Sequence, residues 1–408
     1  STTKDLKNWT HHPIAIGIDE DWEKSICTGS VAYHDGKFYA FYATRLINAD
    51  NRVNEQLSYA ISTDGINFVK QKPNPFYTSA PGYSQRHFRD PKVVVDTNGT
   101  FHLFITSVIE DYSLSEGRGC LVHLTSKDLK EWKLHEPLIS GQRWDPECPD
   151  HFLWNGWYYL VYGQVGDTYY LKSRSPYGPW EFPESQALIE QWVNVAKTAA
   201  FTGNRRIVAG WVPTKREYKD YGREQFGGSV VLREAIQLPN GDLATKFPPE
   251  AIPATGAPIN FNLVASENAT KQASDQAFIN ASGAIGGAYI ANVPYSCRVT
   301  LEIEPTDNSD EFGLFIRTNE KAGDGYKLSF SPKAQIVRFG NDAWIESVGG
   351  LDKIIKLDIV MKEDIIDVSI NNERCIVNRL PEKKGGCLWF FVRNGNAKFS
   401  NIKVYPLL

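Results

Sequence analysis

The fold is decided by the stretch GSVAYHDGKFYAFY, residues 29–42. It consists of two β-rich runs joined by Asp35-Gly36, a dipeptide that favours the tight turn of a β-hairpin. The same pattern returns around Asn98-Gly99 and Asn155-Gly156, and in a looser form around Gly203-Asn204. Because self-similarity at a regular period is typical of repeat architectures, we expect the first part of the chain to be built from repeated hairpins.

A second motif alternates with the hairpin: Asp, a turn residue, two polar residues and an aromatic ring. Copies lie at 4–9, 63–68 and 127–132, with a degenerate copy at 173–180. We interpret it as a β-turn in which Asp caps local backbone amides and the ring packs into a core. A hairpin plus the strands on either side of the Asp turn makes four strands per unit, which is the size of a propeller blade.

The two motifs together predict five blades. Four hairpins are visible, and the turn motif at 4–9 precedes all of them, so the chain is expected to begin inside a blade whose hairpin is absent. From about residue 258 short alternating strands recur at the spacing of a β-sandwich. The predicted fold is all-β, with a five-bladed β-propeller over 1–250, its first blade incomplete, and a β-sandwich over 258–408.

Composition excludes several classes of function. The chain has 408 residues with a net charge of −4, and no basic run or nucleic-acid motif, so no nucleic-acid partner is expected. Apolar runs are only strand-sized, so no membrane span is expected. The six Cys show no C-x-x-C spacing, which predicts no metal site. Four N-x-S/T sequons favour an extracellular or periplasmic protein, and they begin at Asn8, Asn98, Asn268 and Asn280.

Two carboxylates occupy one position of the repeat. Asp90 lies nine residues before Gly99, and Glu147 lies nine residues before Gly156. Equivalent positions of neighbouring blades face one funnel, so these side chains are expected to converge. A converging carboxylate pair is typical of glycosidases, which use one carboxylic acid to protonate the leaving oxygen and a second carboxylate as nucleophile or base.

The motifs around these residues resemble those of glycoside hydrolase family 32, the β-fructosidases that hydrolyse fructans and sucrose. The resemblance rests first on Phe88-Arg89-Asp90-Pro91 and Glu147-Cys148-Pro149-Asp150, and it covers essentially the whole chain. Further matching stretches are 1–16, 28–30, 210–211, 232–234 and 365–371. The family's fold is a five-bladed propeller followed by a β-sandwich.

The resemblance implies a role for each matched residue. Glu147 is implied as general acid/base and Asp90 as the stabiliser of the transition state, with Arg89 supporting it. The implied reaction is retaining cleavage of β-fructosidic bonds in fructans or sucrose-type oligosaccharides, with a fructan or fructo-oligosaccharide as substrate and without a cofactor. The family's nucleophile is an Asp in a W-M-N-D-P-N-G motif that this sequence does not contain. Two alternatives remain: a fructosyltransferase, including one that forms a difructose anhydride, which would share every catalytic residue, or a fructan-binding pseudoenzyme that lacks the nucleophile.

Further residues are predicted to bind substrate. Trp22, Trp144 and Trp211 offer flat apolar ring faces on which a sugar can stack. Asp145 is placed to support a substrate subsite, and Cys148, next to the proposed acid, is expected as a small packed residue at the same site.

Overall fold

The computed structural model describes residues 1–111, 113–185, 187–189, 192–306, 309–319 and 323–408. Over this part of the chain the secondary structure is β-strand, apart from four single 3-10 turns. These turns are η1 (Thr202–Asn204), η2 (Arg216–Tyr218), η3 (Pro249–Ala251) and η4 (Pro332–Ala334). The all-β prediction is therefore confirmed.

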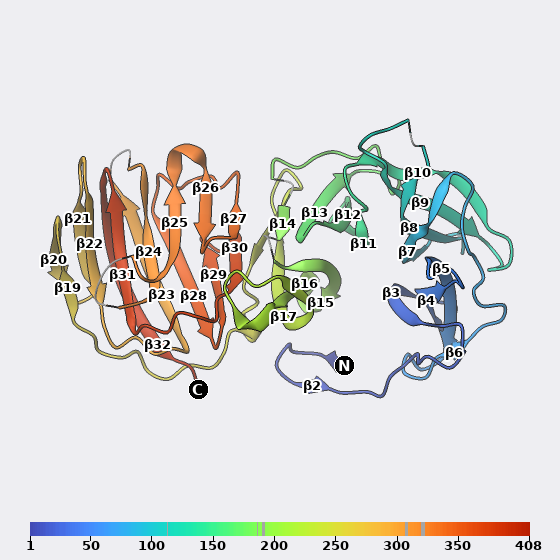
Figure 1. Ribbon diagram of the computed structural model, residues 1–408, viewed down its shortest axis with the longest axis horizontal. Helices are drawn as coiled ribbons and strands as arrows, with labels where there is room; N and C mark the ends of the chain where they lie inside the picture. The colour runs from blue at the N-terminus through green and yellow to red at the C-terminus, as the bar shows by residue number, and fades with distance from the viewer. Residues whose placement is uncertain (112, 186, 190–191, 307–308, 320–322) are drawn as a thin grey trace. The chain divides into compact units, whose positions relative to one another are not determined.

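Four four-stranded sheets, each with its strands hydrogen-bonded in chain order, form the blades of a propeller (Figure 1). Blade 1 contains β3 (Ser25–His34), β4 (Lys37–Ile47), β5 (Val53–Ser62) and β6 (Val69–Lys70). Blade 2 contains β7 (Tyr83–Val95), β8 (Phe101–Ile109), β9 (Gly119–Ser126) and β10 (Lys133–Gln142). Blade 3 contains β11 (Glu147–Trp154), β12 (Trp157–Gln164), β13 (Asp167–Ser173) and β14 (Ala187–Ile189). Blade 4 contains β15 (Asn194–Phe201), β16 (Arg205–Lys215), β17 (Glu224–Gln237) and β18 (Leu243–Lys246).

The prediction of five blades is wrong for the described residues, which form four. The N-terminal turn motif lies between β1 (Thr2–Thr3) and β2 (Trp9–Thr10), which pair only with each other. The physical reason is that the motif is satisfied locally. Asp5 accepts hydrogen bonds from the backbone amides of Lys7 and Asn8 at 3.0 and 2.8 Å, so the turn forms without a sheet behind it.

The blade copies of the motif confirm its predicted chemistry. Asp64 accepts from the backbone amides of residues 66 and 67, both at 2.8 Å, and Asp128 accepts from those of 130 and 131 at 2.9 and 3.0 Å. These hydrogen bonds to the charged form lower the pKa of both carboxyls. The ring of Trp132 then packs against Phe41, with centroids 5.9 Å apart, so this ring reaches a core as the motif predicts.

Two seven-stranded sheets follow. The first runs in the order β19 (Leu263–Ala265), β22 (Ile285–Ile290), β31 (Cys387–Arg393), β24 (Glu311–Thr318), β25 (Tyr326–Ser331), β26 (Ile336–Phe339) and β27 (Ala343–Ile345). The second runs in the order β20 (Ala269–Ala273), β21 (Gln276–Asn280), β32 (Asn396–Pro406), β23 (Cys297–Pro305), β28 (Ile355–Lys362), β29 (Ile365–Ile370) and β30 (Arg374–Arg379).

One core joins these two sheets into a sandwich. Burial alternates along β23, where Val299, Leu301 and Ile303 are buried and the residues between them are less so. Alternation of this kind is typical of a strand with one face on a core. The inward rings of Phe390 on β31 and Phe399 on β32 lie 5.2 Å apart, across the interior of the sandwich.

The chain divides into two compact units. The first comprises 1–165, 169–183 and 195–197, and the second comprises 166–168, 184–194 and 198–408. The second unit therefore holds β16 to β18 together with the sandwich. Within it, Arg233 on β17 makes a bidentate ion pair with Asp367 on β29, at 2.8 and 2.7 Å.

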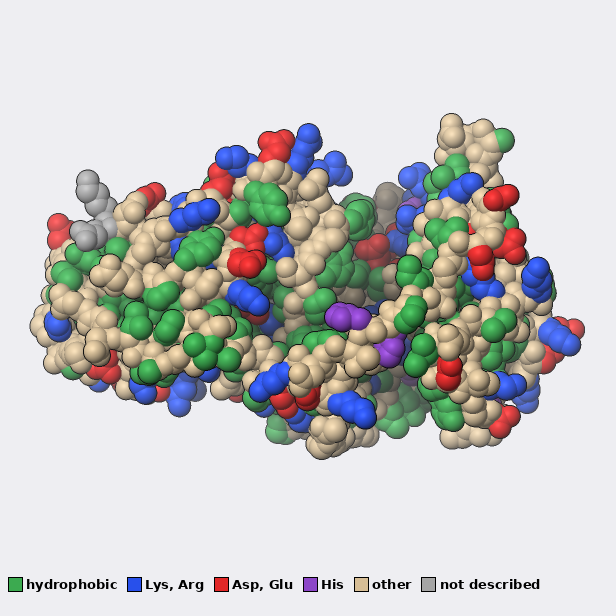
Figure 2. Space-filling view, turned by 90° about the horizontal axis from the view of Figure 1, so that it is seen from below, with side chains coloured by type: hydrophobic (Ala, Val, Ile, Leu, Met, Phe, Trp, Pro, Cys, Tyr) green, Lys and Arg blue, Asp and Glu red, His purple; other side chains and the backbone are tan. Residues whose placement is uncertain are grey.

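The surface and the cysteines add two observations. Lys and Arg are interspersed with Asp and Glu on the face drawn in Figure 2, in keeping with the small net charge. All six Cys are free thiols, and five of them are buried. Over the described residues, the structure contains no helix with the length and apolarity needed to span a bilayer.

Candidate active site

A β-bulge lies at the same point, to within one residue, in the inner strand of three blades. The strand pairing gains one extra residue between Ile26 and Gly29 in β3, between Arg89 and Lys92 in β7, and between Glu147 and Asp150 in β11. Bulges bend a strand and re-aim its side chains, and they occur often beside active sites. The position nine residues before the turn glycine thus falls at the bulge in each blade, and it holds Cys27, Asp90 or Glu147.

The guanidinium of Arg89 is the centre of the site. Nη2 donates to Glu147 Oε1 at 2.8 Å and to Asp145 Oδ2 at 3.0 Å, and Nη1 donates to Glu55 Oε2 at 3.3 Å. Its Nε lies 3.6 Å from Asp90 Oδ2. One cation therefore touches four carboxylates from blades 1, 2 and 3 and from the segment before β11. The side chain is only 12% exposed, so these contacts are little screened by water.

Asp90 is the buried member of the carboxylate pair. The residue is 4% exposed and adopts a left-handed backbone conformation, with φ of 54°. Its Oδ2 accepts the backbone amide of Cys148 at 3.0 Å. Burial raises the pKa of Asp90 because it penalises the charged form, while Arg89, the Cys148 amide and Lys197 act in the opposite direction.

Glu147 is the accessible member of the pair. Its side chain is 41% exposed, although Oε1 is held by Arg89. Trp144, three residues earlier, is 54% exposed, and the Arg143 guanidinium lies 5.9 Å from its ring centroid. The cluster thus presents one carboxyl that a ligand can reach and one that is enclosed.

Asp145 belongs to the same cluster as Glu147. Its Oδ2 contacts His87 Nδ1 at 2.6 Å as well as Arg89. These partners favour the charged form and hold the pKa of Asp145 below its usual range, although burial acts against them. The structure therefore brings Asp145 to the two motif carboxylates, as its predicted place at a subsite requires.

Cys148 connects the inner strands of the three blades. Its amide binds Asp90 of β7, and its Sγ lies 3.4 Å from Thr28 Oγ1 of β3. The residue is 5% exposed, and burial raises the pKa of its thiol, so it remains a packed neutral group. Cys148 thus positions Asp90 through its backbone.

Trp22 and Trp211 remain predictions as sugar-stacking residues. Trp22 is half-buried in the turn that precedes β3. Trp211 lies on β16 in the second unit, where its ring centroid is 6.2 Å from that of Phe226.

The sequence analysis missed two charged residues of the cluster, Glu55 and Lys197. Glu55 on β5 is buried, and it binds Arg45 as well as Arg89. Lys197 on β15 donates Nζ to the Pro149 carbonyl at 2.9 Å and acts electrostatically on Asp90. Neither residue lies in a clear copy of a repeat motif, so only the packing of the strands reveals them.

The described residues contain no candidate metal site. No three His, Cys, Asp or Glu side chains there are grouped as an ion would need. Because Arg89 lies among the four carboxylates, a protein cation offsets part of the negative charge of the cluster.

These features define a glycosidase-like carboxylate site on a propeller scaffold. The chain matches the model of the glycosyl hydrolases family 32 N-terminal domain over residues 1–246. This match covers more than half of the chain, and the protein therefore belongs to glycosyl hydrolase family 32.

Curated relatives of known name are similar over part of the chain. A sucrose-6-phosphate hydrolase of Bacillus subtilis is 30% identical over 175 residues, which are 40% of this chain and 34% of the relative. A sucrose-6-phosphate hydrolase of Escherichia coli is 25% identical over 266 residues, 60% of this chain and 54% of the relative. The chain thus spans between a third and just over half of the length of these relatives.

Solved structures agree on the fold. The sucrose-6-phosphate hydrolase from Lactobacillus gasseri superposes with a TM-score of 0.69 at 15% identity, over 100% of this chain and 83% of that one. A GH32 beta-fructofuranosidase from Bombyx mori superposes with a TM-score of 0.68 at 16% identity, over 99% of this chain and 83% of that one. At such identities the likeness supports the propeller and the sandwich, and nothing finer.

Proposed function

We propose that this chain acts in a β-fructosidase-type glycoside hydrolase that cleaves β-fructosidic bonds in sucrose-type substrates, with fructans and fructo-oligosaccharides as further substrates. The observation that carries the proposal is the convergence of Asp90 and Glu147 on one guanidinium, at bulges in equivalent strands. Membership of family 32 and the names of the curated relatives support the same reaction class.

Glu147 is the proton donor in this proposal. A general acid must reach the leaving oxygen of the scissile bond, and the 41% exposure of its side chain allows such an approach. Arg89 holds one carboxyl oxygen at 2.8 Å and so orients the other. In a retaining reaction the same group later accepts a proton from the incoming water.

Asp90 stabilises the transition state through its charge. Its Oδ2 is fixed by the Cys148 amide, and its surroundings exclude most water. A carboxylate in such a position attracts the positive charge of an oxocarbenium-like transition state, and it can also accept hydrogen bonds from fructose hydroxyls. Arg89 and Lys197 favour its ionised form. The nucleophile of the retaining reaction is not assigned to a residue of this chain, because the W-M-N-D-P-N-G motif that carries it in the family does not occur in this sequence.

Replacement of Glu147 by Gln in the complete protein tests the acid assignment. Glu147→Gln keeps the volume but cannot transfer a proton, so we expect sucrose hydrolysis to fall by about 10²–10⁴-fold. Cleavage of a fructoside with an activated leaving group should fall far less in its first step, because that group leaves without protonation. The exposed Glu131→Gln serves as control. Equal losses on both substrates, or full activity on sucrose, would exclude Glu147 as the acid.

A further inference from the structure

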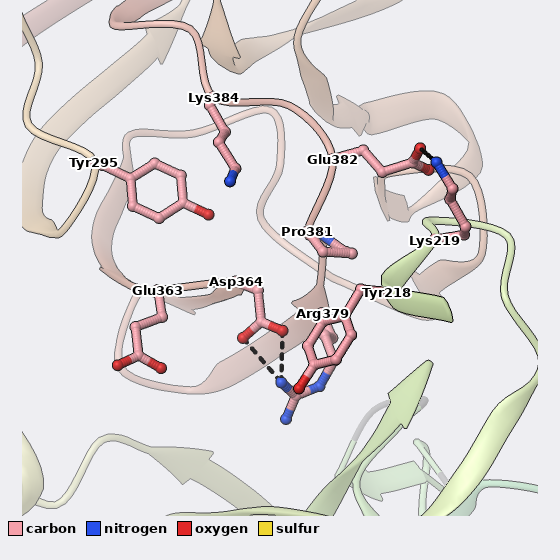
Figure 3. A pocket seen from close by; sticks show the side chains of 9 residues that line it. All are labelled: Tyr218, Lys219, Tyr295, Glu363, Asp364, Arg379, Pro381, Glu382 and Lys384. Carbon is pink, nitrogen blue, oxygen red and sulfur yellow. Dashed lines mark hydrogen bonds and ion pairs between the residues drawn. The ribbon is translucent and has the colours of Figure 1, made fainter. Parts of the chain in front are cut away.

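The second unit contains a pocket of about 620 Å³. Four segments form it: the loop at Tyr218 and Lys219, Tyr295 before β23, the turn Glu363-Asp364 between β28 and β29, and the segment 379–384 after β30 (Figure 3). The segments lie far apart in the sequence, so only the folded unit creates the pocket. The pocket shares no lining residue with the carboxylate cluster around Arg89.

Two ion pairs hold the walls of this pocket. Arg379 Nη1 contacts both carboxylate oxygens of Asp364, at 2.8 and 2.7 Å, and its other nitrogens donate to the Pro213 carbonyl and to Ser229 Oγ. Lys219 Nζ lies 3.0 Å from Glu382 Oε1. These charges neutralise one another within the wall, and each nitrogen of the Arg379 guanidinium already donates to a group of the protein.

Four side chains keep their polar ends open to the pocket. Tyr218 is 68% exposed and Tyr295 is 36% exposed. Lys384 and Glu363 are exposed, and the described residues form no hydrogen bond or ion pair with the ammonium of one or the carboxylate of the other. Figure 3 shows the Tyr295 hydroxyl and the Lys384 ammonium pointing into the space between them.

The two tyrosines are held in place by different means. The Arg317 guanidinium lies 3.8 Å from the ring centroid of Tyr295 and fixes that ring by a cation–π contact. Tyr218 and the preceding Glu217 both have left-handed backbone conformations, with φ of 53° and 59°. Such conformations cost non-glycine residues free energy and persist only where surrounding structure maintains them. The Tyr218 ring is therefore presented to solvent by a fixed turn.

The chemistry of the lining selects the ligand. Three basic side chains (Lys219, Arg379, Lys384) face three acidic ones (Glu363, Asp364, Glu382), so the pocket offers no net attraction to an anion or to a cation. Open donors, an open acceptor and two phenol rings suit a neutral molecule that carries many hydroxyls and flat apolar faces. We propose that this pocket is a second carbohydrate-binding site, which holds a segment of a neutral oligosaccharide or polysaccharide on residues that do not belong to the carboxylate cluster.

Such a site changes how the protein handles a long substrate. A polysaccharide chain bound at this pocket raises the local concentration of its other residues at the same molecule, without any new contact at the carboxylates. The site performs no chemistry of its own. Its test is consequently a binding measurement, which succeeds or fails independently of the proposed hydrolysis.

Native electrophoresis in gels that contain inulin, levan or dextran measures the binding. The protein carrying Glu147→Gln provides the background, since it cannot consume the polymer if the proposed function holds. We expect a polysaccharide to retard this protein, and Tyr218→Ala together with Lys384→Ala to weaken the apparent affinity at least fivefold. Both side chains are exposed, so the variant should fold, as circular dichroism would verify.

Tyr221→Ala is the matched control. Tyr221 is 79% exposed and lies on the same loop, but it does not line the pocket. The control should leave retardation by the polysaccharides unchanged. Neither set of substitutions should alter sucrose turnover in the protein that retains Glu147. Absence of retardation by all three polymers, or equal retardation of the Tyr218 and Lys384 variant, would overturn the second site. Stronger binding of inositol hexakisphosphate than of the neutral polymers would overturn the assignment of ligand class.

Discussion

Removal of the Arg89 charge should destabilise the first unit in a pH-dependent way. Arg89→Met retains an unbranched apolar side chain but leaves Glu55, Asp90, Asp145 and Glu147 without their shared cation. A unit-charge pair at 4 Å is worth about 4 kcal/mol at an effective dielectric constant of about 20. Desolvation of the guanidinium offsets much of the gain from four such contacts.

The expected net loss follows from what happens when a buried ion pair loses one partner. Such a change typically costs about 3–5 kcal/mol, because the remaining charge stays buried without compensation. Four carboxylates relieve their repulsion by binding protons, so their pKa values in the folded variant should lie above those in the unfolded chain. A raised carboxyl pKa means that the folded state holds more protons than the unfolded state.

The sign of the pH dependence follows directly. Stability falls with rising pH wherever the folded state binds more protons than the unfolded state. The loss of unfolding free energy in Arg89→Met, relative to the native protein, should therefore be largest at pH 7 and smaller near pH 4.5. In the native protein the pKa of Asp145 is lowered, so its ionised form stabilises the fold at pH values above the pKa that Asp145 has in the unfolded chain. This stabilisation is lost on acidification, which further narrows the difference in stability between the native protein and the variant.

Urea unfolding at both pH values measures these losses. Tryptophan fluorescence is a suitable probe, since seven of the eleven Trp lie in the first unit. Arg89→Lys, which keeps the charge but not the planar fork, should fall between the native protein and Arg89→Met. A loss below about 1 kcal/mol at pH 7, or an equal loss at pH 4.5, would refute the view that Arg89 offsets the negative charge of the cluster.

Two further predictions concern the first unit. The Ser30 hydroxyl accepts a hydrogen bond from the Val93 amide at 2.7 Å and donates one to the Pro91 carbonyl at 2.8 Å. Ser30→Ala should therefore leave the Val93 amide unpaired between two blades and lower the free energy of unfolding, measured in urea, by about 1–3 kcal/mol. The exposed control Ser113→Ala should leave that free energy nearly unchanged. Burial lowers the pKa of His123 to about 3 and that of His151 to about 4, so both imidazoles stay neutral in the folded protein. The unfolded chain binds a proton at each of them below about pH 6.5, so the free energy of unfolding should decline as the pH falls from there. Each of the two histidines should contribute about 1.4 kcal/mol per pH unit to this decline. His123→Phe should remove the contribution of one proton from this pH dependence of the free energy of unfolding. An unchanged pH dependence would exclude His123 as one of its sources.

Local signals in the sequence were reliable guides to local structure. The Asp-Gly and Asn-Gly dipeptides mark hairpin turns, and Asp35, Asn155, Gly36 and Gly156 adopt the positive φ values that such turns require. The offset of nine residues picked out Asp90 and Glu147 because each lies at or directly beside the bulge of its inner strand. Counting back a fixed number of residues from the hairpin glycine thus located the two carboxylates, although they lie outside the turn.

Non-local features were beyond reach of the same signals. The blade count was wrong because the Asp turn closes on its own amides and needs no sheet, as at Asp5. Glu55 and Lys197 lie outside any clear motif, and they reach the site only through the packing of β5 and β15 in the folded chain. A contact between distant segments leaves no pattern that a single sequence can show.

The two motif carboxylates share a repeat position but not an environment, and the backbone explains why. In β7 the left-handed residue of the bulge is Asp90 itself, with φ of 54°, whereas in β11 it is Cys148, one residue after Glu147, with φ of 50°. This shift by one residue turns Asp90 inward, where the Cys148 amide binds it, and leaves Glu147 directed to Arg89 and to solvent. Glycosidases need two carboxyl groups whose surroundings differ, one to stay charged and one to exchange a proton. A single repeat therefore supplies both kinds of carboxyl, because the bulge falls one residue earlier relative to the carboxylate in one blade than in the other.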